Sequence, residues 1–410
     1  MARARPSSVE ATAGAGRSPK LDVINGLRGI AICGVVWQHL FSVYFKPGSG
    51  HYLFDAARAP YFFLSYGWIG VQLFFLLSGF VLFLPIAEGR AALATRRDWL
   101  AFYRRRAQRL LPLYYIAALL CLVLNQDAPV QETKFLLELG AIAGALFTFS
   151  PHGFEPYFNP PLWSLGVEIW FSILFPAIVL ALRRLGAVRL VVLALVIGCV
   201  SRYLGNVLPA EGPLGVQPLT IGLPASLEIF IAGMVLAELF AARPRGLPLL
   251  RRPALVFLSG MLVVGIAVSL QQLSSADLAV PILFPDILTL GFALMAAALL
   301  SMPAGALKAL FANRPIQLLG MMCFSLYVWH EPLLRHVFKA DMAPLDGLAR
   351  TLPAYLGLLL TVGALSYRYI EFGRVADWRV LFLIERKREA VAAPAPVAAV
   401  ADQTATGASL

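Results

Sequence analysis

Charged residues are scarce in this chain: they make up 14% of its 410 residues, against roughly 25% in soluble domains. It has only four cysteines, none in a Cys-x-x-Cys pair, so the sequence predicts neither a disulfide framework nor a structural zinc site. It also lacks a Walker loop, a Gly-x-Ser-x-Gly elbow and a His-Glu-x-x-His pattern. These absences argue against an ATPase, a serine hydrolase and a zinc metalloprotease.

Apolar residues dominate the composition instead. They make up 59% of the chain, the mean hydropathy is +0.74, and many apolar runs approach the length of roughly twenty residues that spans a bilayer as a helix. We therefore predict an all-α fold, a polytopic bundle of transmembrane helices. The net charge of +11 does not indicate nucleic-acid binding, because the basic residues lie in short clusters between apolar runs, as in cytoplasmic loops.

Eleven apolar runs are candidate spans, at residues 24–44, 66–88, 109–125, 135–150, 162–182, 188–208, 219–241, 253–272, 281–301, 316–338 and 352–373. The run 135–150 is short and carries Glu138. If it crossed the membrane, two of the later basic clusters would lie outside, whereas otherwise the basic clusters lie inside, as the positive-inside rule requires. We therefore predict ten spans in a bacterial inner membrane, with both termini cytoplasmic and 135–150 as a re-entrant or outer-surface helix.

The two ends of the chain differ in composition from the middle. Residues 1–20 and 376–410 are rich in Ala, Pro, Ser and Val, and we expect largely disordered cytoplasmic tails there, with no further folded domain. Residues 21–375 form the predicted membrane domain. No signal peptide is indicated, because the first apolar run has the full length of a span and lacks a cleavage site.

Arg28 and His39 are the most informative polar residues of the first span. They are eleven residues apart, so at about 100° per residue they share one helix face, about 16 Å apart along its axis. Ionisable side chains on membrane helices are costly and usually face the bundle interior at functional sites. A histidine suits general-base catalysis near neutral pH. The alternative is a packed histidine that is only hydrogen-bonded to a neighbouring residue.

Arg106 and Arg109 lie at the cytoplasmic end of the third span. They are three residues apart and therefore share a helix face. Guanidinium groups bind phosphates in a forked geometry, so this pair could bind a phosphate-bearing donor on the cytoplasmic side. On spacing alone, an ordinary positive-inside cluster is the alternative.

Ser164 and Glu168 share a face of the span that opens with PPLWSLGVEIWF, because they are four residues apart. Glu168 lies inside apolar sequence and needs a partner. As a catalytic residue it could orient His39, stabilise its charged form or accept a hydrogen bond from an acceptor hydroxyl. The alternative is a structural ion pair with an arginine. Trp163 could bind substrate by stacking on a sugar ring, or it could be an interface-belt residue.

The run FSLYVWHEPLL places Tyr327, His330 and Glu331 on neighbouring positions in the outer half of its span. We predict that Tyr327 and His330, together with Ser164 and Trp163, contribute to substrate binding. Other intramembrane charges are Glu228 and the pair Arg368 and Glu371. Because the last two are three residues apart, they most simply pair with each other.

Seven of these stretches, in this order, resemble the membrane acyltransferase-3 family, the O-antigen acetylase-like O-acyltransferases. They are LDVINGLRGIAICGVVWQH, GWIGVQLFFLLSGFVL, RRAQRLLPLYY, PPLWSLGVEIWFSILFP, LEIFIAGMVLAE, LGMMCFSLYVWHEPLL and SYRYIEF. The resemblance covers about residues 21–373. Gln72 departs from it, since aspartate is common at that position.

The resemblance implies transfer of an acyl group, expected to be acetyl, from cytoplasmic acyl-CoA to a hydroxyl of a carbohydrate or related acceptor, such as a lipid-linked glycan, without a metal. It maps His39 onto the family's essential histidine and Arg28 onto its arginine partner. Arg106 and Arg109 map onto an Arg-x-x-Arg motif, and Glu168 onto the glutamate of a Trp-Ser-Leu segment. The phosphates of acyl-CoA would bind Arg106 and Arg109, with Arg28 as a further candidate. His39 would act as a general base or carry the acyl group itself.

Two other functions remain open from the residues alone. A proton-coupled transporter or flippase could use His39 and Glu168 as a proton relay, although no internal repeat supports it. A receptor-like or scaffolding protein would leave several intramembrane charges without a use. The identity of the acceptor and of the acyl group, with propionyl and succinyl as alternatives to acetyl, is not determined by the sequence, nor is the oligomeric state.

The ten-span topology predicts which side of the membrane Gly153 faces. A cysteine placed at Gly153 should react with a membrane-impermeant maleimide added to intact cells, because 135–150 does not cross in this topology. Labelling that requires permeabilised cells would contradict the topology.

Overall fold

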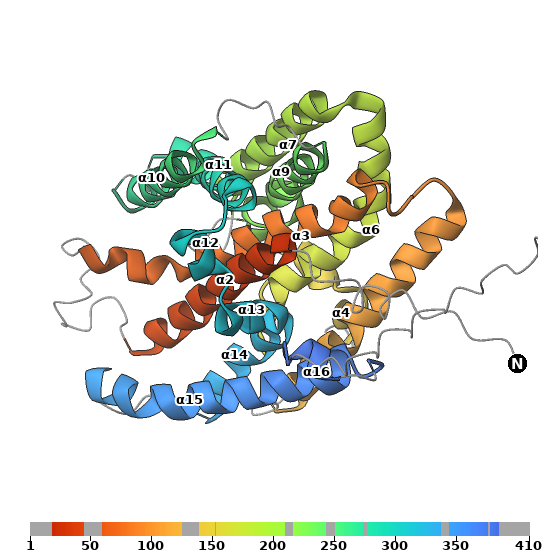
Figure 1. The fold of residues 1–410 in the computed structure, drawn as a ribbon. Coiled ribbons are helices and arrows are strands. Elements are labelled where there is room, and N and C mark those ends of the chain that lie inside the picture. The colour runs from red at the N-terminus through yellow and green to blue at the C-terminus, as the bar shows by residue number, and fades with distance from the viewer. Residues whose placement is uncertain are drawn as a thin grey trace, which may run out of the picture.

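The structure is a computed structural model, and it describes residues 19–44, 60–124, 139–151, 153–209, 216–242, 251–273, 277–337, 344–375 and 378–384. Helices form nearly all of this part, and it contains no strand (Figure 1). The all-α prediction is confirmed. Most of the two predicted tails lies outside the described residues, but the second contains a short helix, α16 (Trp378–Leu381), with Leu381 buried.

Eight helical segments are long and apolar enough to cross a membrane. They contain α3 (Gly70–Ala87), α4 (Arg96–Leu124), α6 (Leu162–Leu185), α7 (Ala187–Val207), α9 (Leu223–Ala241), α10 (Pro253–Leu273), α11 (Ala279–Ser301) and α15 (Pro344–Ser366). Each coincides with a predicted span. These eight segments support a multi-pass membrane protein.

The two remaining predicted spans are more polar or are interrupted. The first is α2 (Pro19–Tyr44), which carries Arg28 and His39. The span predicted at 316–338 is divided between α13 (Arg314–Met321) and α14 (Cys323–Val337).

The run 135–150 does not form a long helix in its described part. Residues 139–144 are helical, Ala145 adopts a left-handed conformation with φ of 51°, and the 3-10 turn η3 (Leu146–Phe149) follows. This part is not among the eight long apolar segments. Whether the whole run is re-entrant or lies on the outer surface stays a prediction, because 135–138 lie outside the described residues.

Helix α2 runs through the middle of the bundle, with α13 and α14 beside it (Figure 1). Glycines let the backbones of α2 and α13 touch: a Cβ at Gly29 would lie 2.1 Å from the Ile316 carbonyl oxygen, and one at Gly320 would lie 1.7 Å from the Asn25 carbonyl oxygen. Contacts between small residues are how membrane helices pack closely without a hydrophobic driving force. They fix the position of α2, and so of Arg28 and His39.

A buried ion cluster joins α7, α9 and α11. Arg202 is only 1% exposed, and its guanidinium binds Glu228 at 2.5 Å through Nη1 and Asp286 at 2.7 Å through Nη2. Nη1 also donates to the Ala225 carbonyl. A single cation therefore holds carboxylates from two other helices. The sequence indicates Glu228 as an intramembrane charge, but it does not indicate that Arg202 is its partner.

Replacing Arg202 should destabilise the protein strongly. Removing one partner of a buried ion pair leaves the other charge uncompensated, so Arg202→Leu should lower the free energy of unfolding by about 3–5 kcal/mol. Arg189→Leu is the matched control, since Arg189 is exposed on the same helix. Denaturant titration of the purified proteins in micelles measures both, and equal stabilities would refute a stabilising role for the cluster.

Candidate active site

The predicted site residues form two groups at different heights along α2. One group surrounds His39 and the other surrounds Arg28, as the spacing on one helix face predicts. A small cavity of about 40 Å³ extends from Arg28 and Glu168 to Ser164 and Tyr327.

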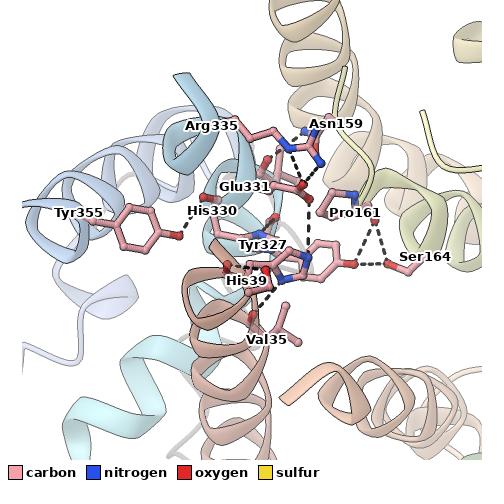
Figure 2. Close-up of polar contacts among 12 residues, drawn as sticks. Val35, His39, Asn159, Pro161, Ser164, Tyr327, His330, Glu331, Arg335 and Tyr355 are labelled. Atoms are coloured by element: carbon pink, nitrogen blue, oxygen red, sulfur yellow. Dashed lines mark hydrogen bonds and ion pairs between the residues drawn. The ribbon is translucent and has the colours of Figure 1, made fainter. Parts of the chain in front are cut away.

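His39 is held by its own helix and faces a carboxylate. Its Nδ1 lies 2.9 Å from the Val35 carbonyl oxygen, one turn earlier. Because a carbonyl only accepts hydrogen bonds, Nδ1 carries the hydrogen in the neutral ring and Nε2 carries the lone pair. Nε2 lies 3.6 Å from Oε2 of Glu331 on α14 (Figure 2). The side chain of His39 is 30% exposed, so a second molecule can reach it.

His330 lies against His39. Its ring is fully buried and meets the His39 ring edge-on, with centroids 4.6 Å apart. The Nδ1 atom of His330 bonds the Tyr327 carbonyl, and the Tyr355 hydroxyl donates to the His330 carbonyl at 2.8 Å (Figure 2). These bonds fix the wall on which the His39 ring rests.

Two hydroxyl groups meet at the end of the cavity nearest this wall. The hydroxyl oxygens of Tyr327 and Ser164 are 2.6 Å apart, and the Tyr327 hydroxyl donates to the Pro161 carbonyl at 3.0 Å (Figure 2). Both residues are buried and line the cavity. The ring of Tyr327 also contacts the ring of His330, with centroids 5.2 Å apart. The cavity therefore ends one side chain away from His39.

A cluster of arginines and glutamates adjoins the opposite end of the cavity, which Arg28 and Glu168 line. Arg106 binds Glu168 at 2.8 Å, and Arg109 lies 3.4 Å from Glu371, which belongs to the π-helical turn η5 (Tyr367–Glu371). Arg28 lines the cavity and interacts electrostatically with both glutamates. Three guanidinium groups face two carboxylates, so this group carries a net positive charge. It suits an anionic ligand.

Contacts of Glu168 and Glu371 correct two expectations. We expected Glu168 to contact His39, but it binds Arg106 and accepts a hydrogen bond from Ser78 at 3.2 Å, and Glu331 occupies the place beside His39. The alternative of an ion pair with an arginine is therefore the one observed. The expected pairing of Arg368 with Glu371 is also wrong, because Glu371 faces Arg109. Both glutamates therefore pair with arginines of another helix, α4, which helix packing places beside them.

Trp163 is placed differently from the other predicted substrate-binding residues. Its ring packs between those of Phe75 and Phe154, with centroids 6.3 and 5.4 Å away. It is not among the residues that line the cavity. The structure thus brings Ser164, Tyr327 and His330 together and assigns Trp163 to the packing around them.

The described residues hold no cluster of three or more His, Cys, Asp or Glu side chains arranged for a metal ion. Chemically, the site offers a histidine with a free lone pair, two hydroxyl groups at the end of a cavity and a positively charged group at the other end. This combination can take a proton from one ligand and bind an anionic part of another.

Comparisons with known proteins match the chain to one family. A model described as an acyltransferase domain (Acyl_transf_3) matches residues 21–367. The chain is 25% identical over 378 residues to O-acetyltransferase OatA of Staphylococcus aureus, covering 86% of this chain and 57% of that protein. It is 27% identical over 336 residues to the exopolysaccharide production protein ExoZ of Rhizobium meliloti, covering 78% and 93%.

A third relative is the peptidoglycan O-acetyltransferase OatA of Listeria monocytogenes, 22% identical over 369 residues, with 85% and 54% covered. The chain thus spans little more than half the length of the OatA relatives. No solved structure matches the chain.

Proposed function

This chain belongs to the acyltransferase-3 family and carries its membrane-embedded acyltransferase domain, and from that premise we propose that it moves an acetyl group from acetyl-CoA on the cytoplasmic side to a carbohydrate hydroxyl, with His39 as the general base. The observation that carries this proposal is one cavity with Arg28 and Glu168 at one end and Tyr327 at the other, where the His330 ring links Tyr327 to His39. The family match supports the reaction class. The donor and the roles of the residues are proposed from the geometry, and the acceptor from the relatives together with the exposed face of His39.

The arginine group is suited to the phosphates of coenzyme A. Arg106 and Arg109 lie in the part of α4 that follows the basic residues Arg104 and Arg105, which are exposed. Arg109 is 34% exposed, so it can bind a ligand without losing its contact with Glu371. With the phosphates bound there and near Arg28, the pantetheine arm would extend along the cavity and bring the thioester toward Ser164 and Tyr327.

Transfer then needs a base and a path for one proton. The acceptor hydroxyl gives its proton to Nε2 of His39 while its oxygen attacks the thioester carbonyl. The carbon–sulfur bond breaks, and the thiolate of coenzyme A receives the proton from the imidazolium. The alternative route passes the acyl group through Nε2 of His39 as an acyl-imidazole.

The acceptor is proposed from the relatives and from the exposed face of His39. Two of the relatives are named for peptidoglycan O-acetylation and for exopolysaccharide production. A polysaccharide outside the cytoplasmic membrane is the matching acceptor here, because His39 lies in the predicted outer half of α2. Ser164, Tyr327 and His330 would line the place where its hydroxyl meets the thioester.

Loss of His39 should abolish transfer. In liposomes with labelled acetyl-CoA on the Arg106 side and a crude bacterial glycan extract on the other, His39→Ala should lower labelled glycan by about 10²- to 10⁴-fold, the usual contribution of a general base. Cys33→Ala, at an exposed position of the same helix, is the control and should label normally. Label transfer that persists in His39→Ala would remove the histidine mechanism.

Loss of Arg109 should weaken donor binding. A charge-assisted hydrogen bond to a phosphate contributes about 1.5–3 kcal/mol, so Arg109→Gln should raise the KM for acetyl-CoA by about tenfold or more. Arg105→Gln makes the same chemical change at an exposed position of the same helix and should leave the KM within about twofold. Equal KM values for the two variants would refute the proposed phosphate site.

A further inference from the structure

We propose that Glu331, held by Arg335, is a positioning residue that orients His39 and balances its positive charge when it takes the proton of the acceptor hydroxyl. The inference rests on the proposed acyl transfer and deepens it, because it names a second group on which the base depends. The residue predicted for this role, Glu168, is engaged elsewhere.

The two carboxylate oxygens of Glu331 have different surroundings. Oε1 accepts a hydrogen bond from Nε of Arg335 at 2.6 Å and also contacts its Nη2. Oε2 is buried and, among the described residues, receives no hydrogen bond. This unpartnered oxygen is the one that lies 3.6 Å from Nε2 of His39 (Figure 2).

The contact between Oε2 and Nε2 lacks one proton. In the neutral ring Nδ1 holds the hydrogen, so two lone pairs face each other across 3.6 Å. When Nε2 gains a proton, the same contact becomes an attraction between an imidazolium and a carboxylate, and a charge-assisted hydrogen bond needs only a small closure. The arrangement therefore favours the state after proton transfer over the resting state, which is the property that accelerates a reaction.

Arg335 distinguishes this arrangement from an ordinary surface pair. Glu331 and Arg335 are four residues apart on α14, a spacing that is common on exposed helix faces. In such a pair both groups reach solvent, but here the Glu331 side chain is 8% exposed and that of Arg335 is 49% exposed. The carboxylate is turned inward to His39, and Arg335 binds the oxygen that His39 does not face.

Other charged groups around the pair do not take this role. Glu155, on the loop before α6, is exposed and interacts with Glu331, His39 and Arg335 only through its charge. His330 bonds the Tyr327 carbonyl, and Tyr355 bonds the His330 carbonyl. Among the described residues, Glu331 is thus the carboxylate in ion-pair range of the His39 ring.

Steady-state kinetics of matched variants test the inference. In the liposome assay, Glu331→Gln should lower kcat by about 10²- to 10⁴-fold, with the KM for acetyl-CoA within about twofold, because removing the orienting carboxylate of a catalytic histidine can cost about 10⁴-fold. Glu331→Asp keeps the charge and should recover part of that loss. Glu155→Gln removes the same charge nearby and should leave kcat within about twofold. Thermal unfolding of each purified variant reports whether it is folded.

The outcomes separate this inference from the proposed function. If His39→Ala abolishes transfer while Glu331→Gln behaves like Glu155→Gln, the general base stands and the role of Glu331 is refuted. A raised KM with unchanged kcat in Glu331→Gln also refutes it. If Glu331→Gln does not fold, Arg335→Gln and Glu331→Asp decide, since a positioning role requires both to lower kcat without changing KM. Transfer that survives in His39→Ala refutes the proposed function itself.

Discussion

The need to compensate ionisable groups inside the membrane governs the arrangement of this bundle. A charged side chain at the centre of a bilayer costs about 2.5–3.5 kcal/mol even on insertion scales, so each one must find a partner on another helix. Arg106 pairs with Glu168, Arg109 with Glu371, and His39 with Glu331. Each pair ties two segments together, and the pairs enclose the space in which we place the reaction.

Close backbone contacts give those pairs their precision. Gly29 and Gly320 let α2 lie directly on α13, and Gly79 of α3 would, with a Cβ, come within 2.0 Å of the Phe230 carbonyl of α9. Interfaces of this kind cannot slide without steric clash. Arg28 and His39 are thus carried on a helix whose height and rotation are fixed by its neighbours, which suits a base that must meet a substrate at one place.

Much of the fold could be predicted from the sequence, but less of the site. Apolar runs of bilayer length located the spans, and helical periodicity placed Arg28 and His39 on one face. Partner choice could not be predicted, because it depends on which helices pack together. Glu168 could have served either Arg106 or His39, and Arg368 was three residues from Glu371 while the actual partner, Arg109, comes from a distant helix. The four-residue spacing of Glu331 and Arg335 is a signal in the sequence from which this pair could be predicted.

The ion cluster around Arg202 has a consequence for biosynthesis. Arg202 is made 26 residues before Glu228 and 84 residues before Asp286. When α7 leaves the ribosome, Glu228 and Asp286, the counter-ions of Arg202 in the folded bundle, have not yet been synthesised. Helix α7 would therefore be poorly retained in lipid until α9 and then α11 arrive, so these three helices should leave the insertion machinery as one unit rather than one at a time.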